Sequence, residues 1–152
     1  MNKKLAKIFL EDQKERKNWQ SWGKTVPIEE VQKRDKERLN AVLQMIKNGK
    51  LVTGRDYWQA AMVLQHGKKA EHYKLANRLC LKAIESGEKN ARWLYAASFD
   101  RLMVNSGEKY QKYGTQFRKN NKNKWELWPI DPGTTDKMRA EYDVPSLKKI
   151  KN

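Results

Sequence analysis

The sequence predicts a mainly α-helical protein: a compact bundle of about five helices, two of them forming a hairpin that resembles a solenoid repeat, followed by a short C-terminal β-hairpin and a small terminal helix. Three observations predict this class. Apolar residues recur at helical spacing through residues 3–106, glycines mark the ends of these stretches, and the spacing changes beyond residue 111. With 152 residues, we expect a single domain (1–152), with a helical part (about 3–106) and a hairpin with a tail (about 111–152).

The composition is poor in aliphatic residues and rich in positive charge. Leu, Ile, Val and Phe account for fewer than one residue in five, and the net charge is +15, which approaches the composition of disordered chains. Six Trp, six Tyr and five Met can supply the missing buried area. We therefore expect a folded, small and basic protein.

The first two predicted helices are joined by a turn that contains two tryptophans. The first helix covers about residues 3–18, and the sequence WQSWGKTVP follows it. Pro27 can occupy the first turn of the second helix, which Asn48 and Gly49 terminate. The apolar residues that recur along this second helix are Ile28, Val31, Leu39, Val42, Leu43 and Ile46.

The next three predicted helices each end at a glycine. The third begins after Thr53, which forms a capping box with Asp56, and ends at His66-Gly67. The fourth covers about residues 69–86 and the fifth about residues 90–105. Small and large residues alternate along this pair as in the helical hairpins of solenoid repeats, where alanines allow two helices to approach closely. These residues are Ala76, Leu79, Cys80, Ala83, Gly87, Ala91, Trp93, Leu94 and Ala97.

The segment after the helices predicts a β-hairpin. Residues 113–117 and 125–130 are rich in aromatic residues and indicate two short strands. The basic stretch RKNNKNK separates them, and the prolines and glycine of residues 129–133 end the second strand. A short helix is expected near residues 135–141, before Val144-Pro145.

Several polar residues fall where the helical spacing calls for apolar ones. In the first helix, the stripe of Leu5, Ile8 and Phe9 continues to Asp12 and Arg16. Any single case is typical of a satisfied ion pair in a core. Several from separate helices must satisfy one another or line a pocket, because an unpaired buried charge is strongly unfavourable. The stripes of the other helices reach Asp35, Gln65, His66, Asp100 and Arg101.

His66 is the natural centre of a candidate pocket. It precedes the helix-ending Gly67, where the negative end of the helix favours an imidazolium, and its ordinary role there is a helix C-cap. His72 lies in the polar start of the next helix and is expected to be exposed, so a two-histidine metal site is not expected. An HExxH motif, a carboxylate triad and a glycine-rich phosphate loop are also missing from the sequence, so we expect neither metal nor cofactor.

The segment from Gln111 to Gln116 presents several polar groups close together. Gly114 permits a tight turn, while Tyr113, Thr115 and Gln116 offer a phenol, a hydroxyl and an amide within four residues. This segment is either a loop that orients a substrate or a corner between a helix and a strand.

The positive charge is spread along the chain, and its densest run is the predicted hairpin tip. The cations of this run are Arg118, Lys119, Lys122 and Lys124. They can contact a polyanion non-specifically or simply keep a solvated tip soluble. Cys80 is the single cysteine, which excludes an internal disulfide and fits a reducing compartment. We find no signal-peptide pattern and no apolar run long enough for a membrane span, and expect a cytoplasmic protein without membrane partners.

The order of the polar motifs resembles a bacterial family of proteins of unknown function. That family is marked by DQ-x-x-R, QH, DR and YGTQ elements in this order, and the resemblance runs from about Asp12 to Leu147. The loop after Phe117 is more basic here than the family leads us to expect. The resemblance brings no established activity. The motif residues in this chain are Asp12, Gln13, Arg16, Asp35, Gln65, His66, Asp100, Arg101, Gln111, Tyr113, Gly114, Thr115, Gln116, Asp136 and Arg139.

Three functions follow from these observations. The first is a small metal-independent enzyme in which His66 acts as general acid or base, oriented by Asp35 or Asp100. Its substrate would be phosphate-bearing or nucleotide-like and would be bound by Asp12, Arg16, Gln65, Arg101, Tyr113, Thr115 and Gln116. The second is a basic module that binds nucleic acid or an acidic protein. The third is an accessory or immunity-type interaction protein whose polar core serves stability alone. The sequence leaves the oligomeric state open.

Overall fold

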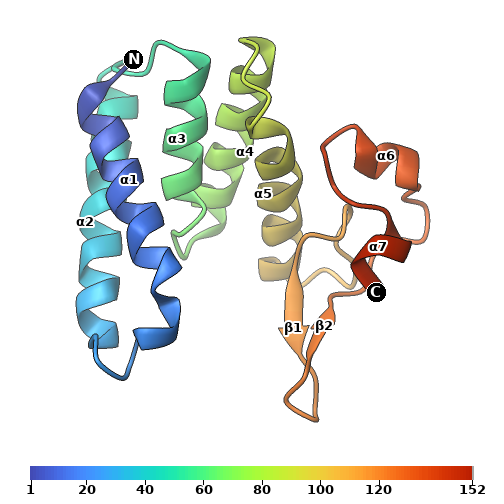
Figure 1. Ribbon diagram of the computed structural model, residues 1–152. Coiled ribbons are helices and arrows are strands. Elements are labelled where there is room, and N and C mark those ends of the chain that lie inside the picture. Colours follow the sequence, from blue (N-terminus) through green and yellow to red (C-terminus); the bar gives the residue numbers. More distant parts are fainter. Residues whose placement is uncertain (152) are drawn as a thin grey trace.

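The computed structural model describes residues 1–151 and confirms a mainly helical protein with a small two-stranded antiparallel sheet (Figure 1). The elements run in the predicted order, with each helix boundary within a few residues of its predicted position. The α-helices of residues 1–151 are α1 (Lys3–Lys17), α2 (Ile28–Lys47), α3 (Gly54–Leu64), α4 (Ala70–Glu85), α5 (Ala91–Asn105), α6 (Asp136–Ala140) and α7 (Leu147–Lys151). A single 3-10 turn, Trp19–Ser21, joins α1 to α2, and the strands are β1 (Phe117–Lys119) and β2 (Trp125–Leu127).

Helices α1 to α5 stand side by side, and α6, α7 and the sheet lie beyond α5 (Figure 1). The main core is formed by residues of all five helices, among them the fully buried Leu5, Val42, Leu64 and Leu94. The predicted pairing of α4 with α5 is confirmed. Its alanines are buried to within 1% exposure, so the two backbones approach closely, as they do in solenoid repeats. These alanines are Ala76, Ala83, Ala91 and Ala97.

The start of α3 confirms the predicted capping box and fixes the N-terminus of the chain. The Thr53 hydroxyl accepts a hydrogen bond from the Asp56 amide, and the Asp56 carboxylate accepts from the Thr53 amide, both at 3.1 Å. The same carboxylate accepts from the amides of Asn2 and Val52. Burial alone would raise the pKa of Asp56, but these backbone hydrogen bonds outweigh it and lower the pKa. The Asp56 side chain therefore caps the start of α3 and also binds the residue that precedes α1.

Helix α5 departs from the single inward stripe expected of it. Trp93, placed on that stripe from the sequence, is 43% exposed, whereas Ala96, Ser98 and Asp100 are buried. The reason is that α5 packs against two partners. One side meets α4, and the other meets a second apolar cluster of Ala96, Tyr113 and Val144. A helix covered on two sides has no single apolar face for a periodicity argument to find.

The two strands are shorter than predicted, and the first lies further along the chain. Residues 113–116 were expected to begin the first strand, but β1 starts at Phe117. The amides of residues 112–115 donate to the carboxylate of Asp100, so they are not free to form hydrogen bonds with a neighbouring strand. The predicted short helix near residues 135–141 is α6, capped by Thr135. Helix α7 was not predicted. No helix within residues 1–151 is long and apolar enough to cross a membrane.

Candidate functional site

The polar residues singled out from the sequence form two clusters instead of one. The first lies where α1, α2 and the end of α3 meet, and we call it the Asp12 cluster: Asp12, Gln13, Glu15, Arg16, Arg34, Asp35, Arg38 and His66. The second is built around Asp100 on α5. Among the contacts of residues 1–151, neither Asp100 nor Tyr113 bonds to His66. Arg101 lies between the two clusters and bonds to a residue of each side.

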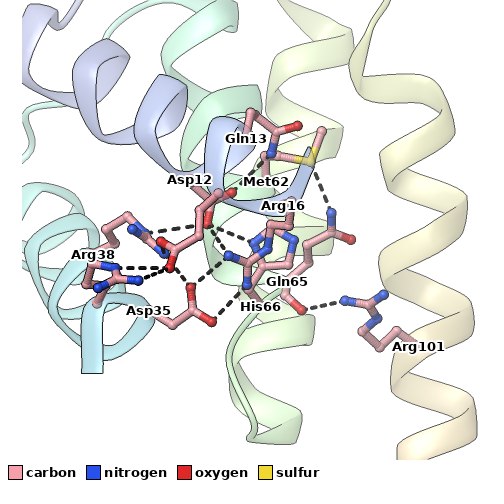
Figure 2. A network of polar contacts seen from close by, with 11 residues as sticks. Asp12, Gln13, Arg16, Asp35, Arg38, Met62, Gln65, His66 and Arg101 are labelled. Atoms are coloured by element: carbon pink, nitrogen blue, oxygen red, sulfur yellow. Dashed lines mark hydrogen bonds and ion pairs between the residues drawn. The ribbon is translucent and has the colours of Figure 1, made fainter. Parts of the chain in front are cut away.

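Asp12 is the hub of the first cluster (Figure 2). Its side chain is 1% exposed, as the α1 stripe predicts. One oxygen, Oδ1, lies 3.1 Å from Arg16 Nη1, 3.1 Å from His66 Nδ1 and 3.6 Å from Arg38 Nε. The other, Oδ2, accepts a 3.0 Å hydrogen bond from Gln13 Nε2. A buried carboxylate held by two hydrogen bonds and two ion pairs is fixed in position as well as paired.

Asp35 holds the arginines that face Asp12. Both Asp35 oxygens accept from Arg16, at 2.8 and 2.9 Å, and Oδ1 also accepts from Arg38 Nη2 at 2.6 Å. Burial alone would raise the pKa of Asp35, but these guanidinium groups outweigh it and lower the pKa. Asp35 does not bond to His66 itself. Its contacts place it as the residue that positions Arg16, and Asp12 as the residue that orients His66.

Sequence reasoning missed three members of the cluster: Arg38, Glu15 and Arg34. Arg38 Nη2 binds Glu15 at 2.8 Å, and Arg34 Nη2 binds the same carboxylate at 2.7 Å. A signal for Arg38 was present, because it lies seven residues after the buried Val31 and is itself only 8% exposed. Glu15 lies seven residues after Ile8 on α1 in the same way. Residues seven apart lie on nearly the same face of a helix, so the stripes through Val31 and Ile8 extend to these two charged residues.

His66 is oriented by Asp12 and has one ring nitrogen free. Because the carboxylate accepts, Nδ1 carries the proton and Nε2 is the basic nitrogen. No hydrogen bond within residues 1–151 uses Nε2, which is not among the buried atoms without a partner, so it remains accessible. Burial lowers the pKa of His66, and the nearby Arg16 and Arg101 lower it further, against the raising effect of Asp12. The expectation that the helix end favours an imidazolium is therefore wrong: α3 ends at Leu64, and burial dominates.

Arg101 is a half-buried cation that pairs with no carboxylate of residues 1–151. Its Nη1 donates to the backbone oxygen of Gln65 at 2.7 Å, and its Nε points to Gln116 Oε1 at 3.4 Å. Burial lowers the pKa of Arg101, and Arg16 lowers it further, although Tyr73 raises it. A guanidinium stays charged in proteins even so. Both arginines lower the pKa of His66, but only Arg16 has carboxylate partners.

A groove of about 930 Å³ opens beside His66, between α2 and the segment from the end of α3 into α4. Leu39, Leu43 and Leu75 provide its apolar part. Both histidines line it. His72 is half-buried there, against the expectation that it is exposed, because α4 begins with the His72 ring folded back onto Gly67. The charged residues that line this α2–α4 groove are Glu29, Lys33, Asp35, Lys36, Lys68, Lys69, Glu71 and Arg78.

Asp100, predicted to orient His66, instead holds the loop of residues 112–115. It is fully buried and accepts hydrogen bonds from four backbone amides and from the Thr115 hydroxyl, all between 2.8 and 3.0 Å. The Gln111 side chain accepts from the amides of Thr115 and Gln116 and donates to the backbone oxygens of Gln116 and Trp128. The prediction of a catalytic Asp100 is therefore not supported by its contacts, because every oxygen lone pair that faces a donor is already used by the fold.

The other members of that loop have structural partners too. Tyr113 is 5% exposed, packs edge-on against Phe99 and Tyr142, and has its pKa raised by burial. The Thr115 hydroxyl is bonded to Asp100. Gln116 alone reaches the first cluster, through Arg101. Of these three predicted substrate-orienting residues, only Gln116 contacts Arg101. Tyr113 and Thr115 are part of the packed corner between α5 and β1.

The four cations of the predicted polyanion surface lie on the β-hairpin. Arg118 pairs with Glu126 at 2.9 Å and lies over the Trp128 ring, whereas Lys119, Lys122 and Lys124 are exposed. Within residues 1–151, no three His, Cys, Asp or Glu side chains are grouped so that they could hold a metal ion. The geometry thus offers one oriented histidine, one uncommitted arginine and one groove. Comparisons with protein-family models, curated proteins and solved structures gave no match to this chain, so the resemblance stated from its motifs stays a prediction.

Proposed function

We propose that the protein is an enzyme in which the Asp12–His66 pair acts as general base and acid on a substrate with an anionic, phosphate-type group held by Arg101. One observation carries this proposal: a guanidinium without a carboxylate partner lies near enough to lower the pKa of a histidine whose Nδ1 is fixed by a buried carboxylate. A structural ion-pair network alone gives no reason for that unpaired charge. An anionic ligand does.

The histidine supports acid–base chemistry at neutral pH. Its lowered pKa keeps the ring mostly neutral at pH 7, so Nε2 is ready to accept a proton from a substrate hydroxyl or a water. Asp12 holds the ring in the Nδ1–H tautomer and stabilises the imidazolium that forms when Nε2 takes the proton. The same imidazolium then returns the proton to the leaving group. Arg16 and Arg38 keep Asp12 in place throughout.

Arg101 supports recognition of the anion. Its two bonds fix the guanidinium through Nη1 and Nε and leave further N–H donors unused within residues 1–151. A planar fork of this kind suits the oxygens of a phosphate or carboxylate group. Arg16 is paired with Asp12 and Asp35. It therefore contributes positive potential near the anion but no free pair of N–H donors to bind it.

The α2–α4 groove supports a substrate larger than a bare anion. Its volume of about 930 Å³ is of the size that holds a nucleotide-sized ligand. The leucines can cover an apolar part, and the lysines at its edge favour further negative charge. We also propose a cytoplasmic location for this reaction. The single free Cys80 supports it, because cysteines of oxidising compartments are typically paired in disulfides and this chain offers Cys80 no internal partner.

Two pairs of variants test the proposal. The first measures hydrolysis or transfer on a panel of phosphomonoesters, phosphodiesters and nucleotides, with H66Q against H72Q. Both histidines line the groove, but only His66 has a carboxylate partner. We expect H66Q to lose about a hundredfold or more in kcat and H72Q to lose less than about tenfold. Equal losses in the two variants would contradict an Asp12–His66 base.

The second pair measures binding of inorganic phosphate and pyrophosphate by calorimetry, with R101M against R55M. Arg55 is an exposed arginine that lies outside the Asp12 cluster, over Trp58. We expect R101M to weaken binding at least tenfold while R55M binds as the parent does. If R101M binds as well as the parent, and H66Q and D12N lower only the melting temperature, the polar cluster serves stability alone.

A further inference from the structure

We infer that the β1–β2 hairpin is a binding site for single-stranded nucleic acid, with bases stacked on Phe117 and Trp125 and phosphates bound by the lysines of the hairpin tip. This site uses no residue of the Asp12 cluster, so it does not depend on the proposed reaction. Figure 1 shows the hairpin extending away from the helices, where a strand can reach it.

One face of the hairpin carries two exposed aromatic rings. The register pairs Phe117 with Leu127 and Lys119 with Trp125, so these four side chains share a face. Phe117 is 51% exposed and Trp125 is 66% exposed, which is unusual for rings that could have been turned into a core. Lys119 lies 5.5 Å from the centre of the Trp125 ring. Rings and cation are thus interleaved on the surface of a single short sheet.

The tip adds positive charge in an ordered arrangement. The Asn120 side chain accepts from the amides of Lys122 and Lys124, and its backbone bonds to residues 123 and 124. Asn123 adopts the left-handed conformation that closes this turn. From Phe117 to Trp125 the sequence contains four cations and no carboxylate. The neighbouring Glu126 is occupied by Arg118, so the three lysines face an incoming ligand without local competition.

Single-stranded nucleic acid fits this surface better than the other polyanions do. Aromatic rings that stack on bases, next to cations that follow the backbone, are the common design of single-strand binding proteins. A base in a duplex is already stacked on its neighbours and offers no free face to Phe117 or Trp125. An acidic polypeptide would use the lysines but would gain little from the two rings. The rings therefore distinguish the ligand classes.

The test is fluorescence anisotropy with labelled oligouridylate and oligothymidylate of about 12 nucleotides, a length within the usual site size of such surfaces. A duplex of the same length, heparin and polyglutamate are measured beside them. Two variants remove the rings or the charge: F117A/W125A and K119Q/K122Q/K124Q. Their controls are W19A, which removes a ring that is 59% exposed at the end of α1, and K3Q/K4Q/K7Q, which removes three exposed lysines from α1.

We expect the parent to prefer single strands to the duplex, with affinity that falls as salt rises. F117A/W125A should weaken single-strand binding about tenfold or more and leave heparin binding unchanged. The hairpin lysine variant should weaken both, and more than its α1 control. H66Q should bind as the parent does, which separates this site from the proposed reaction. The inference is overturned if the duplex or polyglutamate binds as tightly as the single strands. Unchanged binding by F117A/W125A, or equal losses in the two lysine variants, would overturn it as well.

Discussion

Removing the Asp100 carboxylate should destabilise the protein severely, because the fold of the loop after α5 depends on it. Four backbone amides and one hydroxyl donate to its two oxygens, and the side chain is fully buried. In D100A these donors lose a charged acceptor and are left in a site closed to water. Hydrogen bonds to charged groups contribute about 1.5–3 kcal/mol each, but bonds to one group are not additive. A buried donor left without an acceptor costs about 1–3 kcal/mol, and for these five non-additive donors we take about 4 kcal/mol for D100A.

Urea denaturation measures this loss directly. With a slope of about 2 kcal/mol per molar for a domain of this size, 4 kcal/mol lowers the midpoint by about 2 M. T115A is the matched control, since it removes one of the five donors to this carboxylate, the hydroxyl, together with a methyl group. We expect it to cost about 1 kcal/mol, or about 0.5 M. If D100A and T115A shift the midpoint by the same small amount, the loop does not depend on Asp100, and a catalytic role for this carboxylate returns.

Three further outcomes follow from the structure. Gly107 and Gly114 both have positive φ, but a Cβ at Gly114 would lie 2.6 Å from Ile130 Cδ1, whereas nothing lies within 4 Å at Gly107. G107A should cost about 1 kcal/mol and G114A about 2–4 kcal/mol by thermal denaturation. The lowered pKa of His66 means that the folded state binds fewer protons than the unfolded state. The parent should therefore lose stability as pH falls below 6.5, and H66Q should lose less, because only His72 keeps a lowered pKa there; a parallel pH profile would refute this. Burial raises the pKa of Cys80 to about 12, so its thiol should react with a disulfide reagent only as fast as the protein unfolds, and rapid labelling of the native state would contradict the buried position.

The helices were predictable because their signals are local. The capping box at Thr53, the glycines after α4 and α5, and the apolar spacing of α1 each involve residues within about one or two turns of one another. The strands were not, because their limits depend on a contact between distant residues. Asp100 takes the amides that the sequence pattern assigned to the first strand, and the sequence between positions 100 and 112 carries no sign of that competition.

The candidate site was predictable in its members but not in its grouping. Periodicity placed Asp12 and Asp100 inside correctly, and both are buried to within 1% exposure. Periodicity could not predict which polar residues contact one another. A stripe shows which face of a helix is buried, but not which other helix packs against that face. Arg38 shows the limit most clearly. It is the buried arginine that completes the pairing of Asp12 and Asp35, yet a long cation on a highly charged helix is usually a surface residue.

The pairing of the arginines favours a ligand at this site over a purely structural network. Arg16, Arg34 and Arg38 each have at least one carboxylate within 3.1 Å, so the burial of Arg16 and Arg38 is compensated by the protein itself. Arg101 is half-buried, as Arg16 is, but its acceptors are a backbone oxygen and an amide oxygen. A network under selection for stability alone would place a carboxylate there or replace the arginine. An anion from outside would compensate this charge, which is the reason for our proposal of a ligand near His66.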